Sequence, residues 1–265
     1  MEFLRKAGAA TLDTLVYLGA LATLAFRSAW AVLSGPFVGK PVSYKTTIEQ
    51  AMEAGIRALP ILSLITFFIG LILALQAAYE LESFGAMNLV ASGVAISMSR
   101  ELGPLITAII VIGRSGSAFA AELGTMKVSE EIDALETMAI DPVYFLVAPK
   151  FVAMTVMLPC LTIWALAMGI FGGAVFGVLK ADFTWYTYIK TSLDSLEMRD
   201  VTTGLVKSVM FGITITAVGC LEGLLTDGGA EQVGRSTTRA VVVSIFLVIL
   251  VDLVFTTLFF LLGGH

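Results

Sequence analysis

Four ionisable residues lie within stretches of the chain that are otherwise apolar. Arg100 and Glu101 interrupt one such stretch, Lys207 interrupts a second, and Asp252 interrupts a third. If these stretches cross a membrane, each ionised side chain costs on the order of 2.5 to 3.5 kcal/mol near the bilayer centre, so each is expected to face a partner or a water-filled cavity. Such residues either form structural ion pairs or bind a polar ligand or an ion.

The composition indicates that these stretches do cross a membrane. Hydrophobic residues make up 57% of the chain, charged residues only 14%, and the mean hydropathy is +0.92. These values are typical of an all-α integral membrane protein. The net charge of −5 is spread over several loops and indicates no nucleic-acid partner. Because no linker or low-complexity tract divides the chain, residues 1–265 are predicted to form one polytopic domain.

Uncharged runs predict five transmembrane helices. About 20 residues, at about 1.5 Å each, cover a hydrocarbon core of about 30 Å. Two runs reach this length without a charge, and three reach it by including the residues named above. The predicted spans are Ala58–Tyr79, about Asn88–Gly113, Phe151–Leu179, about Val201–Leu221 and about Ala240–Leu262.

Residues 1–46 are predicted to form an interfacial helix and a linker, ahead of a transmembrane core over residues 47–265. The uncharged run between Asp13 and Arg27 is too short to span a bilayer, and basic residues flank its apolar turns. This pattern is typical of a helix that lies in the membrane interface.

The placement of Lys and Arg predicts a cytoplasmic N-terminus and a C-terminus on the outer side, because cytoplasmic loops carry the excess of these residues. In this orientation the outer segments carry only Lys180, Lys190 and Arg199. The inner segments carry Arg5, Lys6, Arg27, Lys40, Lys45, Arg57, Arg114, Lys127, Lys150, Arg235 and Arg239.

Counting along the spans predicts that Glu101, Lys207 and Asp252 meet in the outer half of the membrane. Glu101 lies 13 residues from Arg114 at the inner edge, which corresponds to roughly 20 Å of helix. Adjacent residues on a helix point about 100° apart, so Arg100 and Glu101 are not expected to face the same partner squarely. No partner for Asp252 follows from the sequence, and a structural ion pair stays open for it.

The segment from Arg114 to Pro149 holds too many charges for a span. Apolar residues nevertheless recur in it at helical spacing, so one face of the predicted helix from Glu122 to Met138 is apolar and the other is charged. Such a helix is either a solvated surface helix or a docking helix for a cytoplasmic partner. The residues predicted to make that contact are Glu122, Glu130, Asp133, Leu135 and Glu136.

Motifs for several kinds of catalysis are absent. The segment from Gly113 to Ser117 lacks the last glycine of a nucleophile elbow, and the only histidine is His265. The sequence contains no GxxxxGK[ST] phosphate loop and no metal-ligand spacing. The chain is therefore predicted to catalyse no bond chemistry and to hold no cofactor.

Three segments resemble the MlaE (YrbE) family of ABC-transporter permeases. They are RELGPLITAIIVIGRSGSAFAAELGTMKVSEEIDALETMAIDP from Arg100 to Pro142, LVKSVMFGITIT from Leu205 to Thr216, and GRSTTRAVVVS from Gly234 to Ser244. The resemblance runs from about Thr47 to the end of the chain. Before Thr47 the N-terminal helix matches only in character.

The resemblance implies a permease subunit that moves phospholipid, or a related lipid, between inner and outer membranes. It implies a homodimer in the bacterial inner membrane, two cytoplasmic ATPase subunits that use the ATP, a periplasmic ring of Mce-domain subunits, and often a small STAS-domain protein. The helix from Glu122 to Met138 would be the coupling helix received by the ATPase. The lipid cavity would be lined by Arg100, Glu101, Lys207, Leu71, Leu75 and Tyr79.

Two other classes of function remain as alternatives. An ion-coupled secondary transporter would use Glu101, Lys207 and Asp252 as a proton or ion relay, although no inverted repeat supports it. A membrane scaffold without transport would leave the intramembrane charges without a purpose.

Overall fold

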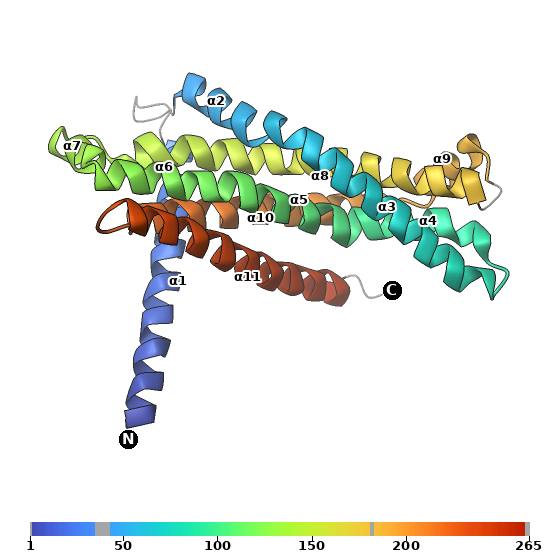
Figure 1. Ribbon diagram of the computed structural model, residues 1–265, viewed down its shortest axis with the longest axis horizontal. Helices are drawn as coiled ribbons and strands as arrows, with labels where there is room; N and C mark the ends of the chain where they lie inside the picture. The colour runs from blue at the N-terminus through green and yellow to red at the C-terminus, as the bar shows by residue number, and fades with distance from the viewer. Residues whose placement is uncertain (1, 35–42, 181–182, 263–265) are drawn as a thin grey trace.

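The computed structural model describes residues 2–34, 43–180 and 183–262, and these residues contain helices and no strand. Five long helical rods run side by side as an elongated bundle, with α7 at one end and α9 at the other (Figure 1). We call these the α7 end and the α9 end. The first rod consists of α2 (Tyr44–Ala54), the short η1 (Ile56–Ala58) and α3 (Leu59–Glu82).

The second rod begins with η2 (Met87–Leu89) and α4 (Val90–Ser97), and it contains two π-helical turns, η3 (Met98–Leu102) and η4 (Ile112–Gly116), on either side of α5 (Gly103–Val111). It ends with α6 (Ser117–Val128). The remaining elements are the short α7 (Glu131–Thr137), the π-helical turn η5 (Val143–Val147), α8 (Ala148–Lys180), α9 (Trp185–Asp194), α10 (Met198–Leu224) and α11 (Ala230–Leu262).

All five predicted spans are found as helices. Within the described residues, six helices are long and apolar enough to cross a membrane: these five and residues Thr14–Ser34 of α1 (Glu2–Ser34). The run after Asp13 thus reaches spanning length once Arg27 is included. In Figure 1 α1 lies across the bundle rather than along it, and its interfacial placement stays a prediction. Most of the predicted linker, with Lys40, lies outside the described residues.

Glycines allow α3 and α8 to approach closely. A Cβ on Gly70 of α3 would lie 1.9 Å from the carbonyl oxygen of Gly169 on α8, so only a residue without a side chain fits this crossing. Helix α8 has Pro159 in its interior, and its buried face packs against α3, α10 and α2. The main core therefore forms between α8, α10 and the second rod, with Leu158, Phe211 and Ile215 fully buried.

The predicted single helix from Glu122 to Met138 is wrong. The second rod continues to Val128, so Glu122 belongs to α6, and a turn at Ser129 and Glu130 separates it from α7. The rod continues because α6 packs against α10 and α11. There a Cβ on Gly223 of α10 would lie 2.7 Å from the Cβ of Leu123, a close approach that holds α6 in the bundle.

Candidate functional site

The π-helical turn η3 presents Arg100 and Glu101, and the sequence explains why the helix widens there. Pro104 has no backbone N–H and cannot continue the normal hydrogen-bond ladder to residue 100. The N–H of Gly103 instead donates to the carbonyl of Met98, five residues back. π-Helical turns inside α-helices often occur at functional sites. Here the turn carries two of the four ionisable residues that the sequence analysis singled out.

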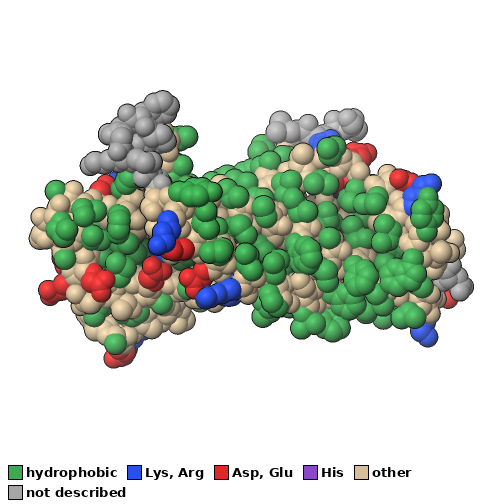
Figure 2. Space-filling view, turned by 90° about the horizontal axis from the view of Figure 1, so that it is seen from above, with side chains coloured by type: hydrophobic (Ala, Val, Ile, Leu, Met, Phe, Trp, Pro, Cys, Tyr) green, Lys and Arg blue, Asp and Glu red, His purple; other side chains and the backbone are tan. Residues whose placement is uncertain are grey.

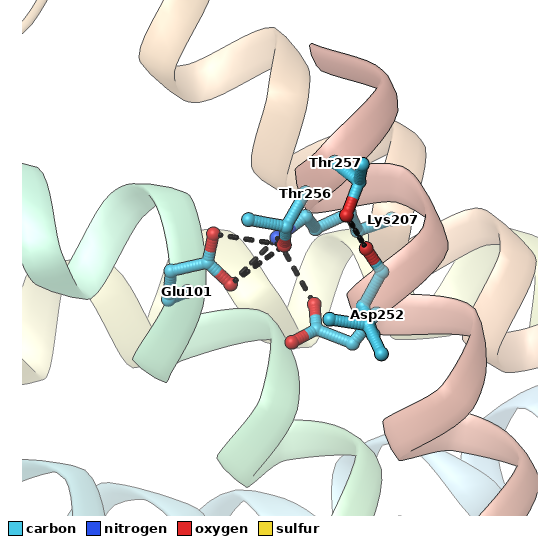
Figure 3. A network of polar contacts seen from close by, with 6 residues as sticks. Glu101, Lys207, Asp252, Thr256 and Thr257 are labelled. Atoms are coloured by element: carbon cyan, nitrogen blue, oxygen red, sulfur yellow. Dashed lines mark hydrogen bonds and ion pairs between the residues drawn. The ribbon is translucent and has the colours of Figure 1, made fainter. Parts of the chain in front are cut away.

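Lys207 of α10 is the centre of the site and is 0% exposed. Its ammonium group donates to Glu101 Oε2 at 2.6 Å and to Thr256 Oγ1 at 2.7 Å, and it forms an ion pair with Asp252 Oδ1 at 3.0 Å (Figure 3). Two of the three N–H donors of this lysine thus form hydrogen bonds, and Asp252 contributes a charge contact. The site joins η3, α10 and α11.

This cluster of Glu101, Lys207, Asp252 and Thr256, which we call the Lys207 cluster, contains two carboxylates and one cation. The Glu101 side chain is 39% exposed, whereas that of Asp252 is 17% exposed. The excess negative charge therefore has an open side at Glu101. An arrangement of this kind can accept a hydrogen bond or a positive group from outside the chain without unpairing Lys207.

Arg100 lies beside this cluster but has a different partner. Its guanidinium forms an ion pair with Asp200, whose side chain is 1% exposed, while the Arg100 side chain is 50% exposed. Asp200 also accepts a hydrogen bond from the backbone N–H of Glu197 in the capping box at the start of α10. The expectation that Arg100 and Glu101 face different partners is confirmed. Arg100 ties η3 to the α9 end of α10.

The expected meeting of Glu101, Lys207 and Asp252 is also confirmed, and their place in the outer half of the membrane stays a prediction. The partner of Asp252, which the sequence left open, is Lys207. Leu75 and Tyr79 on α3 are 50% and 78% exposed, and Leu71 is half-buried. These three apolar residues face outward from a single chain and are not part of the Lys207 cluster.

The residues predicted to dock a partner divide into two groups. Glu122 lies on α6 and forms an ion pair with Lys150 of α8 at 2.6 Å, a lysine that is 2% exposed. Glu130, Asp133, Leu135 and Glu136 lie at or within α7; Leu135 is half-buried, and the other three are exposed. Asp133 pairs with Lys127 at 2.5 Å.

Several polar contacts were not predicted from the sequence. Asp200 pairs with Arg100, and Thr256 belongs to the Lys207 cluster. The depth of Arg100 requires a partner for its charge, but the sequence does not indicate which residue that partner is. At the α7 end, Glu222 of α10 is 3% exposed, accepts a hydrogen bond from the Tyr17 hydroxyl at 2.7 Å, and pairs with Arg239. Tyr17 thereby fixes the middle of α1 to the bundle.

Comparison with known proteins shows the family. The model for the family described as Permease MlaE matches residues 47–258. The chain belongs to the MlaE permease family. It is an all-α, multi-pass membrane protein, and the matched region begins within α2 and includes every residue of the Lys207 cluster.

Relatives from three groups of organisms match most of this MlaE-family chain. It is 39% identical to a probable ABC transporter permease protein of Rickettsia prowazekii over 220 residues, which cover 83% of this chain and 85% of the relative. It is 34% identical to the intermembrane phospholipid transport system permease protein MlaE of Haemophilus influenzae over 233 residues, or 86% and 89% of the two chains. It is 35% identical to the chloroplastic protein trigalactosyldiacylglycerol 1 of Arabidopsis thaliana over 244 residues, or 87% and 69%.

Replacing Lys207 with Met should strongly destabilise the protein. Glu101 and Asp252 would then face each other without a cation, and removing one partner of a buried pair typically costs about 3 to 5 kcal/mol. Because Glu101 is partly exposed, we expect a loss near the lower end of this range. The amount of folded protein in the membrane and the thermal unfolding temperature in detergent measure the effect.

Lys190→Met is the matched control, because Lys190 is an exposed residue of α9. It should leave both measured quantities close to those of the unmodified protein. Equal stability of the two variants would show that the Lys207 cluster does not hold the helices together.

Proposed function

We propose that this chain is the transmembrane permease subunit of an ABC transporter that moves phospholipid between the inner and outer membranes of a bacterium. The family match over residues 47–258 carries the proposal, because that region includes the whole Lys207 cluster. The names of the relatives support it: one is called an ABC transporter permease, and another a permease of an intermembrane phospholipid transport system. The chain itself would supply no catalytic site or cofactor, and a separate subunit would use the ATP.

The proposed assembly has two copies of this chain, a cytoplasmic ATPase, a periplasmic ring of Mce-domain subunits and, in addition, a small STAS-domain protein. Family membership supports the ATPase and the ring, and the homodimer and the STAS-domain protein follow from the resemblance alone. In this arrangement the α7 end is cytoplasmic, and the α9 end and the C-terminus are periplasmic. The excess of Lys and Arg in the segments at the α7 end supports that orientation.

The proposed cargo site begins at the partly exposed charges of η3. Arg100 and Glu101 are each held by a buried partner on α10, yet 50% and 39% of their side chains remain exposed. A phosphate group can bind the guanidinium of Arg100, and an ammonium or hydroxyl group can bind Glu101. Leu71, Leu75 and Tyr79 of α3 would supply apolar contacts for the acyl chains.

The proposed contact with the ATPase is α7 together with the turn before it. Two residues that are not glycine have left-handed backbone conformations at its ends, Glu130 with φ 60° and Ala139 with φ 58°. Such conformations are energetically costly and persist where the surroundings define the shape of a segment. The exposed acidic residues Glu130, Asp133 and Glu136 give this end of the molecule a charged surface for a partner.

Proteoliposomes that contain the purified complex test the proposal directly. A phospholipid with a fluorescent headgroup should leave the membrane for the Mce-domain subunits, or enter it from them, only when ATP and the ATPase are both present. The permease alone should neither bind nor hydrolyse ATP. Transport that needs an ion gradient but no ATP would instead establish the secondary transporter, and ATP hydrolysis by the pure chain would overturn the permease assignment.

Variants of α7 should uncouple the ATPase. Charge reversal at Glu130 or Asp133, or Leu135→Ala, should lower the retention of the ATPase on the permease and its stimulation by lipid, because each change alters the surface offered to the partner. Pull-down from detergent and ATP hydrolysis measure the effect. Charge reversal at Glu82, at the far end of α3, is the control and should change neither quantity. If all three α7 variants behave like this control, α7 is only a solvated surface helix.

A further inference from the structure

A polar hollow lies near the α7 end, apart from the Lys207 cluster. It has a volume of about 290 Å³ and lies between α2, η4 and α6. Gln50 and Glu53 line it from α2, Arg114 from η4, and Glu122 from α6. Like Arg100 and Glu101, Arg114 lies in a π-helical turn. The two turns are separated by roughly 20 Å along the same rod.

The charges around this hollow leave one cation without a counter-ion. Glu53 pairs with Arg57 at 3.1 Å, and Glu122 pairs with Lys150 at 2.6 Å. Arg114 forms no ion pair with any residue in the described part of the chain; one of its N–H groups donates to the backbone carbonyl of Glu53 at 2.9 Å. A guanidinium group has five N–H donors and binds a phosphate or carboxylate group through two of them at once. The hollow therefore fits an anion.

The surface next to the hollow is apolar. Along α3 toward the α9 end, Ile61, Leu64 and Phe68 are each at least 50% exposed. Seen from above, hydrophobic side chains cover most of the half of this face near the α9 end, and Lys, Arg, Asp and Glu side chains gather between that area and the α7 end (Figure 2). A ligand that binds across this boundary needs an anionic head and an apolar body.

We propose that the hollow at Arg114 binds the phosphodiester headgroup of a glycerophospholipid from the leaflet at the α7 end, with its acyl chains along α3. In the proposed orientation this is the cytoplasmic leaflet. Glu53 and Gln50 line the same hollow and offer acceptors for the hydroxyl or ammonium group of the head. The site does not depend on which cargo the protein transports, because it is defined by Arg114 and not by the Lys207 cluster.

Photolabelling of the full-length chain in detergent micelles tests this site. The probe is a phosphatidylglycerol with a diazirine in its headgroup. In the unmodified protein it should label peptides that contain residues 44–57 and 112–127. Arg114→Gln should lower this labelling roughly tenfold or more, because a charge-assisted bidentate contact is lost. Arg114→Lys should retain part of the labelling. Labelling near residues 98–102 is recorded separately, so a failure of the proposed cargo site is distinguishable from a failure of this site.

Arg27→Gln is the matched control. Arg27 is a half-exposed cation on α1 that pairs with Asp141 and does not line the hollow, so its loss changes the net charge equally. Labelling in this variant should equal that in the unmodified protein. Excess inorganic phosphate or glycerol phosphate should compete poorly with the lipid probe, since neither has acyl chains.

Three results would overturn the proposal. Unchanged labelling in Arg114→Gln with a lower thermal unfolding temperature would mean that Arg114 only holds α2 through the Glu53 carbonyl. Competition by inorganic phosphate at the same concentration as lipid would assign the hollow to a free anion. Unchanged labelling with loss of the ATPase in pull-down would assign Arg114 to an acidic group of the protein partner.

Discussion

The buried ammonium group of Lys207 is the constraint on which the arrangement of the helices at this site depends. A lysine at 0% exposure in the membrane region must be compensated by neighbouring groups, and its partners lie on η3 and α11. Glu101 therefore brings η3 to α10, while Asp252 and Thr256 bring α11 to it. Asp200, another buried charge of α10, is compensated in the same way by Arg100. These polar contacts of Lys207 and Asp200 fix the positions of η3, α10 and α11 relative to one another.

The same compensation leaves functional groups available. Because each buried charge is paired, Arg100 and Glu101 retain exposed surface without a further desolvation cost. Both lie in a π-helical turn that Pro104 makes necessary, so the widened backbone and the charges have one cause in the sequence. Arg114 likewise lies in a π-helical turn, η4, nearer to the α7 end. Polar groups thus occur at two depths along one continuous rod, which suits a protein that handles a ligand with both a charged and an apolar part.

The sequence predicted the spans and the central cluster well, because both depend on simple lengths. Apolar runs of about 20 residues, three of which include a charge, predicted the five rods, and counting residues along them predicted that Glu101, Lys207 and Asp252 meet. Tertiary contacts decided the rest. The partner of Arg100 is Asp200, far away in sequence. Helix α6 extends to Val128 because it packs against α10 and α11, and this places Glu122 beside Lys150 of α8. Tyr17 reaches Glu222 over 205 residues, a contact that no local pattern indicates.

The central claim is that the Lys207 cluster acts on the cargo as well as on the fold. Removing all three charges together, with Glu101→Gln, Lys207→Met and Asp252→Asn, leaves no unpaired charge in the membrane, so the variant should fold in nearly normal amounts. The decisive measurement is ATP-dependent transfer of phospholipid by this variant in the reconstituted complex, with its abundance recorded in parallel. The account predicts normal abundance with transfer reduced at least roughly tenfold, as expected for the loss of a charged contact. Normal abundance with normal transfer would contradict it.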